Sequence, residues 1–386
     1  MAACGRPIGA PGQAAFARMA VYAPAPPPRM NAADLRDRVA AVVDPYLGQP
    51  LGSAVRGAAI EGGEAVVRIV LGFPVGGYST ELTAQIAAEL ILAGWTGGVR
   101  LDLSAEIESQ GVQGSLKPLP SIRNVLAIAS GKGGVGKSTT AANFALALAA
   151  QGARVGLLDA DIYGPSQPLM MGLAGERPTT EDGKHLNPLR AYGVEVMSIG
   201  FLIDPEQPMV WRGPMVTQAL MQLIGDTRWS ELDYLIIDMP PGTGDTQLTI
   251  SQRIPVSGAI IVTTPQDIAL ADARKGLQMF RKVSVPVLGV VENMATHICS
   301  NCGHEEHVFG AGGGQRMASE YGIPLLGSLP LDIRIREQTD GGTPTVVAEP
   351  KGRIAAAYLD IARRAAGRLA SGTAARSFPS ITVSDD

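Results

Sequence analysis

Residues 125–140 read Val-Leu-Ala-Ile-Ala-Ser-Gly-Lys-Gly-Gly-Val-Gly-Lys-Ser-Thr-Thr, an apolar run that leads into a glycine-rich loop. The loop matches the P-loop pattern, in which Gly131 is followed by four residues and then by Gly136-Lys137-Ser138. A strand before the loop and a helix over 140–150 after it form the context in which this pattern binds phosphate. The stretch therefore predicts a nucleotide site where a strand meets a helix, within an α/β fold.

The residue types in this loop suit phosphate chemistry. Backbone N–H groups of a glycine-rich turn can point at phosphate oxygens, and the N-terminus of the following helix adds a favourable dipole. We expect Lys137 to bridge the β- and γ-phosphates of ATP, and the Ser138 hydroxyl to bind Mg²⁺. The residues expected around the nucleotide are Gly131, Lys132, Gly133, Gly134, Val135, Gly136, Lys137, Ser138 and Thr139.

Short apolar runs alternate with helical segments from residue 123 onward. These runs lack the period-2 alternation of half-exposed strands, as expected for strands that helices cover on both faces. We therefore predict a doubly wound, mostly parallel sheet, with an amphipathic closing helix over 353–370. The predicted strands are 125–129, 155–158, 194–198, 234–237, 259–263, 287–291 and 325–328.

Carboxylates follow two of these strands. Asp161 comes just after the strand over 155–158, and Asp238 ends the Walker B-like strand over 234–237. Ligands of open α/β sheets bind at the carboxyl ends of the strands, where the P-loop also lies. We expect Asp238 to hold Mg²⁺ through water.

The sequence before residue 123 predicts a separate, smaller unit. Residues 30–110 indicate an α+β domain, with a helix capped by Asn31 and a second helix that begins near Ser79. Residues 111–122 are predicted to be a linker, and 123–370 the P-loop domain. A proline-rich leader (1–29) and a polar tail (371–386) are expected to be disordered. We favour Met30 over Met1 as the first residue, because a helix-start signal follows it directly.

Composition excludes several classes of function. The 386 residues include 32 Lys and Arg against 36 Asp and Glu, and a net charge of −4 disfavours broad binding to nucleic acid. No run of 18 apolar residues predicts a membrane span. The three cysteines are too few for a disulfide scaffold, so we expect a reducing, cytoplasmic compartment.

Two of the three cysteines form a Cys-x-x-Cys pair, Cys299 and Cys302. Two thiolates at this spacing can bind one metal, but they supply only half of a four-cysteine site. Pairs from two chains could hold a [4Fe–4S] cluster, or His304 and His307 could complete a zinc site within one chain. A thioredoxin-like redox pair is less consistent with the surrounding pattern. The residues by themselves leave the cluster and the zinc site open.

Several motifs resemble one family. Lys132 resembles the second lysine of the deviant Walker A loop found in the MinD/ParA/Mrp ATPases. Residues 123–370 resemble the Mrp/ApbC group of iron–sulfur cluster carrier ATPases, whose cysteine pair MinD and ParA lack. The matching segments are Gly-Lys-Gly-Gly-Val-Gly-Lys-Ser, Asp-Ala-Asp-Ile-Tyr-Gly-Pro-Ser (159–166), Trp-Arg-Gly-Pro-Met (211–215), Asp-Met-Pro-Pro-Gly-Thr-Gly-Asp (238–245), Thr-Pro-Gln-Asp (264–267) and Glu-Asn-Met (292–294).

The resemblance implies roles for single residues. Lys132 is expected to reach the phosphates of the other subunit in a nucleotide-sandwich homodimer. Asp161 matches the switch I aspartate and is expected to orient the attacking water. The Gly242 amide lies in a switch II-like segment and is expected to sense the γ-phosphate. Asn293 is expected to contact adenine.

The resemblance also implies a function: an ATPase that binds an iron–sulfur cluster at a dimer interface through Cys299 and Cys302. Its partners would be cluster scaffold proteins and apo iron–sulfur proteins, with neither nucleic acid nor membrane. Residues 30–110 resemble a small iron–sulfur assembly domain, some relatives of which carry a cysteine before the second helix. Here residues 74–79 contain no thiol, so we expect no metal ligand there. The alternatives are a MinD/ParA-like positioning ATPase, or a P-loop ATPase with structural zinc.

Overall fold

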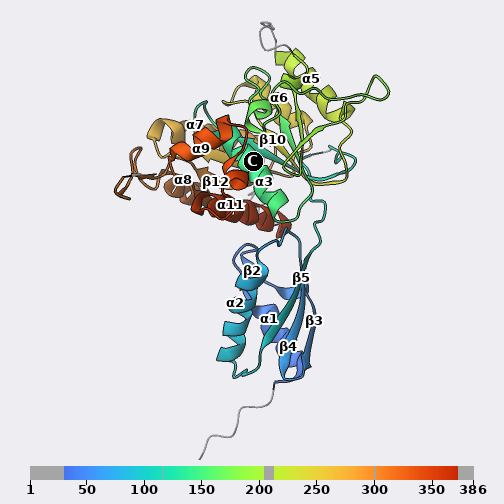
Figure 1. Ribbon diagram of the computed structural model, residues 1–386, viewed down its shortest axis with the longest axis vertical. Coiled ribbons are helices and arrows are strands. Elements are labelled where there is room, and N and C mark those ends of the chain that lie inside the picture. Colours follow the sequence, from blue (N-terminus) through green and yellow to red (C-terminus); the bar gives the residue numbers. More distant parts are fainter. Residues whose placement is uncertain (1–29, 115, 204–212, 300, 373–386) are drawn as a thin grey trace, which may run out of the picture.

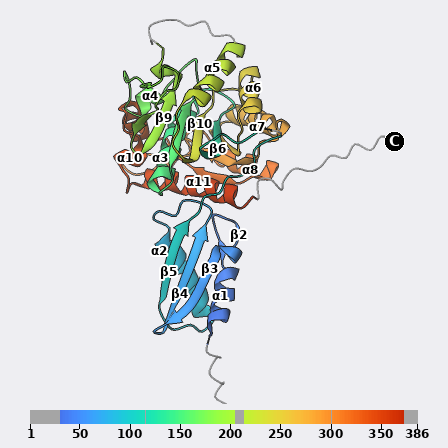
Figure 2. The ribbon, with the colours of Figure 1, turned by 90° about the vertical axis from the view of Figure 1, so that its right-hand side faces the viewer.

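The computed structural model describes residues 30–114, 116–203, 213–299 and 301–372. The predicted disordered leader, with Cys4, lies outside the described residues, as do Trp211, Arg212 and all but the start of the predicted tail. Two units follow one another along the chain, and the smaller lies below the helix α11 (Arg353–Ala370) of the larger in both views (Figures 1 and 2).

The smaller unit is a three-stranded sheet with two helices. Its strand order is β3-β4-β5, where β3 pairs with β4 in antiparallel and β4 with β5 in parallel orientation. Asn31 forms a capping box at the start of α1, which explains why the helix begins there. The elements are α1 (Ala32–Ala41), β1 (Val43–Asp44), β2 (Gln49–Pro50), the short 3₁₀ helix η1 (Gly52–Ala54), β3 (Val55–Glu61), β4 (Glu64–Leu71), α2 (Ser79–Leu92) and β5 (Val99–Ala105).

The larger unit is built on an eight-stranded sheet of order β15-β12-β11-β6-β10-β7-β9-β8. All neighbouring strands are parallel except β8, which pairs in antiparallel orientation with β9 at one edge. The strands are β6 (Ile122–Ala129), β7 (Val155–Asp159), β8 (Leu189–Ala191), β9 (Val194–Ser198), β10 (Leu232–Asp238), β11 (Gly258–Thr263), β12 (Val287–Glu292) and β15 (Leu325–Ser328).

Helices cover both faces of this sheet. The crossover from β6 through α3 to β7 runs toward the β8 edge of the sheet. The crossovers through α6, α7 and α8 run toward the opposite edge, at β15. Because such crossovers are right-handed, α3 lies on one face and α6, α7 and α8 on the opposite face. The helix α11 packs against α3. The helices are α3 (Lys137–Ala150), α4 (Gln167–Met170), α5 (Gly213–Asp226), α6 (Asp245–Arg253), α7 (Asp267–Lys282), α8 (Gly313–Tyr321), α9 (Ile333–Asp340), α10 (Thr345–Ala348) and α11 (Arg353–Ala370), with η2 (Ile199–Phe201) a short 3₁₀ helix.

The predicted fold class is confirmed: a doubly wound, mostly parallel α/β unit follows a small α+β unit. The strands β6, β7, β9, β10, β11 and β12 are buried almost throughout, which is why they show no period-2 alternation. The helix after the P-loop begins at Lys137 rather than at residue 140, because the loop closes directly into the first helical turn.

The two units meet at the C-terminal ends of α3 and α11. The Gly76 amide donates to the Gln151 carbonyl at 3.0 Å, and the Arg363 guanidinium donates to the Gly76 carbonyl at 2.9 Å. That guanidinium lies 5.1 Å from the ring centre of Tyr46 and 5.0 Å from that of Tyr78. The thiol-free loop over 74–79 therefore serves as a contact between the units.

Within the described ranges, no helix combines the length and the apolar character that a membrane span requires.

Candidate functional site

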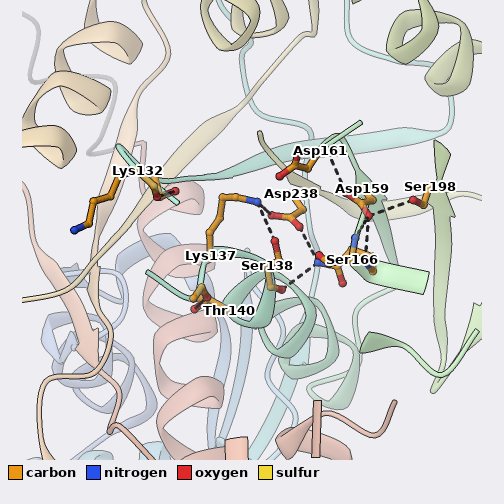
Figure 3. A network of polar contacts seen from close by, with 12 residues as sticks. Lys132, Lys137, Ser138, Thr140, Asp159, Asp161, Ser166, Ser198 and Asp238 are labelled. Carbon is orange, nitrogen blue, oxygen red and sulfur yellow. Dashed lines mark hydrogen bonds and ion pairs between the residues drawn. The ribbon is translucent and has the colours of Figure 1, made fainter. Parts of the chain in front are cut away.

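The P-loop joins β6 to α3 at the carboxyl edge of the sheet, beside two aspartates. In the strand order, β10 lies between β6 and β7, and Asp238 is in register with both Ile128 and Asp159. Parallel pairing thus brings three segments that are distant in sequence to one edge. Figure 3 shows their polar side chains around Lys137.

Lys137 and Asp238 form the buried centre of this site. The Lys137 ammonium pairs with one carboxylate oxygen of Asp238 and lies 3.0 Å from the Ser138 hydroxyl oxygen. The other oxygen of Asp238 accepts a hydrogen bond from the Gln167 side chain at 2.8 Å. Asp238 is fully buried and Lys137 is 6% exposed, so water does not screen this pair. The structure thus brings together three of the predicted residues.

Asp159 holds the segment that carries Asp161. Its carboxylate accepts hydrogen bonds from the backbone amides of Asp161, Ser166 and Gln167 at 3.0–3.1 Å, and from the Ser198 hydroxyl at 3.2 Å. Burial, and after it the charge of Asp238, raise the pKa of Asp159 to about 7. The loop after β7 is therefore fixed by one buried carboxyl group.

Asp161 lies on the same side of the site as Lys137 and Asp238 (Figure 3). Burial is the main cause that raises the pKa of Asp161, and the charge of Lys137 opposes it. A carboxylate of raised pKa is a better proton acceptor at neutral pH, which suits a group that orients water. The role of Asp161 stays a prediction.

Lys132 behaves differently from Lys137. Its side chain extends away from Lys137, Asp161 and Asp238 (Figure 3), and among the described residues it forms no ion pair. The Ser130 hydroxyl donates to the Lys132 carbonyl at 2.9 Å, which holds the backbone of the loop while leaving the ammonium directed outward. The Lys132 ammonium therefore lies outside the polar cluster around Lys137, and its role at the phosphates remains a prediction.

The two other predicted nucleotide contacts are bonded to the P-loop segment. The Gly242 amide donates to the Ser130 carbonyl at 3.1 Å. The Asn293 side chain donates to the Val135 carbonyl at 2.9 Å. Their predicted contacts to the γ-phosphate and to adenine remain predictions.

Backbone packing explains one glycine of the loop. A Cβ at Gly131 would lie 2.1 Å from the backbone carbonyl carbon of Asp272 on α7, so no larger residue fits there. Of the other predicted residues, Gly133 and Gly134 lie in the same turn between β6 and α3, and Thr139 lies in the first turn of α3.

Sequence reasoning missed Asp159 and Gln167. Asp159 is the first residue of the Asp-Ala-Asp-Ile-Tyr-Gly-Pro-Ser motif, but it was assigned no function from the sequence. Its position at the end of a buried strand could have indicated that it lies at the site. Gln167 is fully buried and bonds to both Asp238 and the Ser138 carbonyl, at 2.8 and 3.1 Å. No motif or spacing in the sequence singles it out.

The cysteine pair lies on a small hairpin after β12. The hairpin consists of β13 (His297–Ile298) and β14 (Glu305–Glu306), and the Cys299 amide donates to the His304 carbonyl at 2.9 Å. Cys299 is half-buried and Cys302 is exposed. Hydrogen bonds from the backbone of Cys302 and Asn301 lower the pKa of the Cys299 thiol, which favours the thiolate that binds metals.

Two of the three histidines near the pair, His297 and His307, are turned toward backbone carbonyls, whereas His304 is exposed. Nδ1 of His297 lies 3.1 Å from the Leu331 carbonyl oxygen, and Nδ1 of His307 lies 2.8 Å from that of Ala295. Within the ranges that the structure describes, no three His, Cys, Asp or Glu side chains form a group that could hold a metal ion. In the described ranges, Cys299 and Cys302 thus lie without a third such side chain grouped with them.

The fold and the P-loop site define a P-loop NTPase. A model of the ParA family, described as NUBPL iron-transfer P-loop NTPase, matches residues 121–366. The chain belongs to this family.

Similar proteins agree with this assignment. An iron–sulfur cluster carrier protein of Pseudomonas fragi is 61% identical over 264 residues, which cover 68% of this chain and 92% of that protein. The iron–sulfur cluster transfer protein NUBPL of Mus musculus is 52% identical over 268 residues, covering 69% and 83% of the two chains. A nucleotide-binding protein of Archaeoglobus fulgidus in complex with ADP has a similar structure, with a TM-score of 0.52, 38% identity, and coverage of 60% and 90%. The resemblance to cluster carrier ATPases is confirmed.

Proposed function

We propose that this protein hydrolyses ATP and carries an iron–sulfur cluster of the [4Fe–4S] type between the cysteine pairs of two chains. It passes the cluster from scaffold proteins to apo iron–sulfur proteins. The observation that carries this proposal is the cysteine hairpin, where two thiols lie near the surface without a third grouped ligand in the described residues. Four thiolates are the usual ligand set of such a cluster, so two chains supply a full set.

In the proposed hydrolysis, water attacks the γ-phosphorus of ATP while the bond to the β–γ bridging oxygen breaks, releasing ADP and phosphate. Asp161 orients the water, helped by a pKa that burial raises. Lys137 neutralises charge on the phosphates, and Lys132 of the partner subunit does so from across the dimer. The outward direction of Lys132 supports this assignment, because its ammonium points away from Lys137, Asp161 and Asp238 of its own chain.

The residues present fit Mg²⁺. Hydroxyl and carboxylate oxygens are the donors that this hard cation prefers, and Ser138 and Asp238 present both beside Lys137. Ser138 would hold the ion directly and Asp238 through water. When bound, Mg²⁺ neutralises charge on the β- and γ-phosphates.

The cysteine hairpin suits a cargo that must leave again. Cys302 is exposed, so thiolates of an acceptor protein can approach a cluster bound there. A cluster shared across a subunit interface loses half of its ligands when the two chains separate or rotate. Changes in dimer geometry that follow ATP binding and hydrolysis would therefore change how firmly the cluster is held.

Anaerobic reconstitution with iron and sulfide tests this proposal. The wild-type chain should gain a brown, oxygen-sensitive absorbance with about four irons per two chains. Cys299→Ser should lose both the colour and the iron, whereas the matched control Cys4→Ser should keep them. Colourless protein with stoichiometric zinc in the wild type would contradict the proposal and favour an ATPase with structural zinc.

A further inference from the structure

Asn293 lies between the two sites and bonds to the backbone on both sides. It follows the last residue of β12, and it is 7% exposed. Its side-chain Nδ2 donates to the Val135 carbonyl at 2.9 Å, while its Oδ1 accepts from the Met294 amide at 3.0 Å. One buried amide thus connects the P-loop with the segment that leads to the cysteines.

On the P-loop side, Asn293 is bonded to the peptide unit that joins Val135 to Gly136. Gly136 has a φ of 80°, and a Cβ there would lie 2.2 Å from Nδ2 of Asn293, so the amide fills this space. The carbonyl of Val135 and the N–H of Gly136 belong to one planar trans unit and point in opposite directions. A phosphate that attracts the N–H of Gly136 therefore also sets the direction of the carbonyl that Asn293 holds.

On the other side, Asn293 begins a strained turn. Met294 has a φ of 57°, a left-handed conformation that costs a non-glycine residue about 1 kcal/mol. Its amide is held by Oδ1 of Asn293, so the same side chain that contacts the P-loop supports this turn. Because this hydrogen bond lies within the strained turn, movement of the Asn293 side chain acts directly on the turn.

After this turn, backbone bonds join the segment that leads into the cysteine hairpin to the chain that follows β15. The Ala295 amide donates to the Leu329 carbonyl at 2.9 Å, and the Leu331 amide donates to the Thr296 carbonyl at 2.7 Å. From the far end of the hairpin, His307 bonds back to the Ala295 carbonyl. Movement at Met294 is therefore passed to the segment that carries Cys299.

We propose that Asn293 is a positioning residue that couples the P-loop to the cysteine hairpin. Nucleotide phosphates orient the 135–136 peptide unit, and Asn293 passes this change through the Met294 turn to Cys299. The inference rests on the proposed function in that ATP and the cargo occupy these two sites. It leaves room for an adenine contact, because an amide oxygen accepts two hydrogen bonds.

Thiol reactivity tests this coupling without any cluster. The alkylation rate of Cys299 and Cys302 by iodoacetamide is measured on the cluster-free full chain, with and without a saturating, non-hydrolysable ATP analogue and Mg²⁺. We expect the analogue to change the wild-type rate about five-fold or more. Asn293→Asp keeps the size and the acceptor but loses the donor to Val135, so its change should fall below about two-fold.

Asn124→Asp is the matched control. Asn124 is also a buried asparagine, and its side chain donates to the backbone carbonyls of Glu108 and Asp233. It lies in β6, before the P-loop, and in these bonds it makes no contact with the segment between Asn293 and the cysteine hairpin. It should keep the full effect of the nucleotide. If Asn293→Asp keeps that effect as well, or only weakens nucleotide affinity while the effect at saturation persists, the inference is overturned.

A measurement on the wild type removes dependence on any variant. Amide hydrogen exchange over 294–298 should change on binding of the analogue, and unchanged exchange there would overturn the inference. Its failure is distinguishable from that of the proposed function. A chain that assembles a cluster but shows no nucleotide effect on the thiols overturns the coupling alone, whereas a coupled chain without a cluster contradicts only the carrier proposal.

Discussion

The nucleotide site and the cysteine hairpin differ in how much of each site one chain supplies. Around the P-loop, buried carboxylates on two adjacent strands, Asp159 and Asp238, hold their neighbours through several hydrogen bonds each. On the hairpin, Cys302 is exposed and Cys299 half-buried, and the rings of His297 and His307 bond to backbone carbonyls. The first site is organised by the core of the sheet, whereas the second presents two thiols near the surface, which under the proposed function are half of a ligand set.

The largest expected effect comes from the centre of the nucleotide site. Lys137→Ala should lower the rate of ATP hydrolysis by about 100- to 1000-fold, because it removes charge stabilisation at the phosphates. Iron loading, measured without nucleotide, should stay within two-fold of wild type, since the cysteines lie on a separate element. Phosphate release and iron content check this, with the exposed Lys351→Ala as control.

Loss of iron loading in Lys137→Ala would break the contrast between the two sites. Because this change also leaves Asp238 buried without its cation, unfolding by urea must be measured on the same sample.

Lys132 tests whether the nucleotide site is complete in one chain. Lys132→Ala should lower ATP hydrolysis at least about 10-fold and lower cluster transfer, while iron loading is kept. An equal mixture of Lys132→Ala and Lys137→Ala chains should regain about a quarter of the wild-type rate, because half of the dimers are mixed and each has one intact site.

No recovery in that mixture, at concentrations where dimers form, would show that Lys132 serves its own chain. The contrast would then be sharper, since one chain would supply the whole nucleotide site while the hairpin would still need a partner. Chain concentration is the control variable, because recovery that depends on a partner must fall on dilution.

The buried Asp159 predicts a pH dependence of stability. Its pKa is about 7 in the folded chain, against about 3.9 for an unperturbed aspartate. Between these values the folded state binds more protons, so the free energy of unfolding falls as pH rises and levels off above pH 7. Asp159→Asn should flatten this slope by on the order of 1 kcal/mol per pH unit.

Urea unfolding from pH 4.5 to 8, without Mg²⁺ and nucleotide, measures this slope. Asp332→Asn is the control, because the pKa of Asp332 is shifted in the opposite direction: hydrogen bonding to Arg334 lowers it. Its contribution is lost only below about pH 4, so the slope in this window should not change. An unchanged slope in Asp159→Asn would contradict the role given to that carboxyl group.

The smallest effect concerns the hairpin. His307→Asn retains a donor near the position of Nδ1, which bonds to the Ala295 carbonyl. It should change iron content by less than about two-fold, because the proposed function places the cluster on the cysteines alone. Loss of metal binding in this variant would indicate a site completed within one chain. Metal analysis after reconstitution, with Cys299→Ser as the reference for full loss, distinguishes the two.

Much of the fold was predictable because its signals are local. The strand before residue 131, the loop and the following helix are contiguous, and buried parallel strands such as β10 are read from unbroken apolar runs. The edge strand β8 was not predicted, since three residues with partial exposure carry no periodic signal. Gln167 was missed for a related reason: its role depends on which carboxylate lies beside it after folding.

By itself, the sequence determined the class of fold, the phosphate loop and the pair of thiols, because each of these features is formed by residues that are close together in the chain. Only the tertiary structure decided which groups share a hydrogen bond. It joined Asp238 to Lys137 and Gln167, and Asn293 to the P-loop, because parallel strands bring distant strand ends to one edge of a sheet. It also directed Lys132 away from its own site, which no spacing of residues could show.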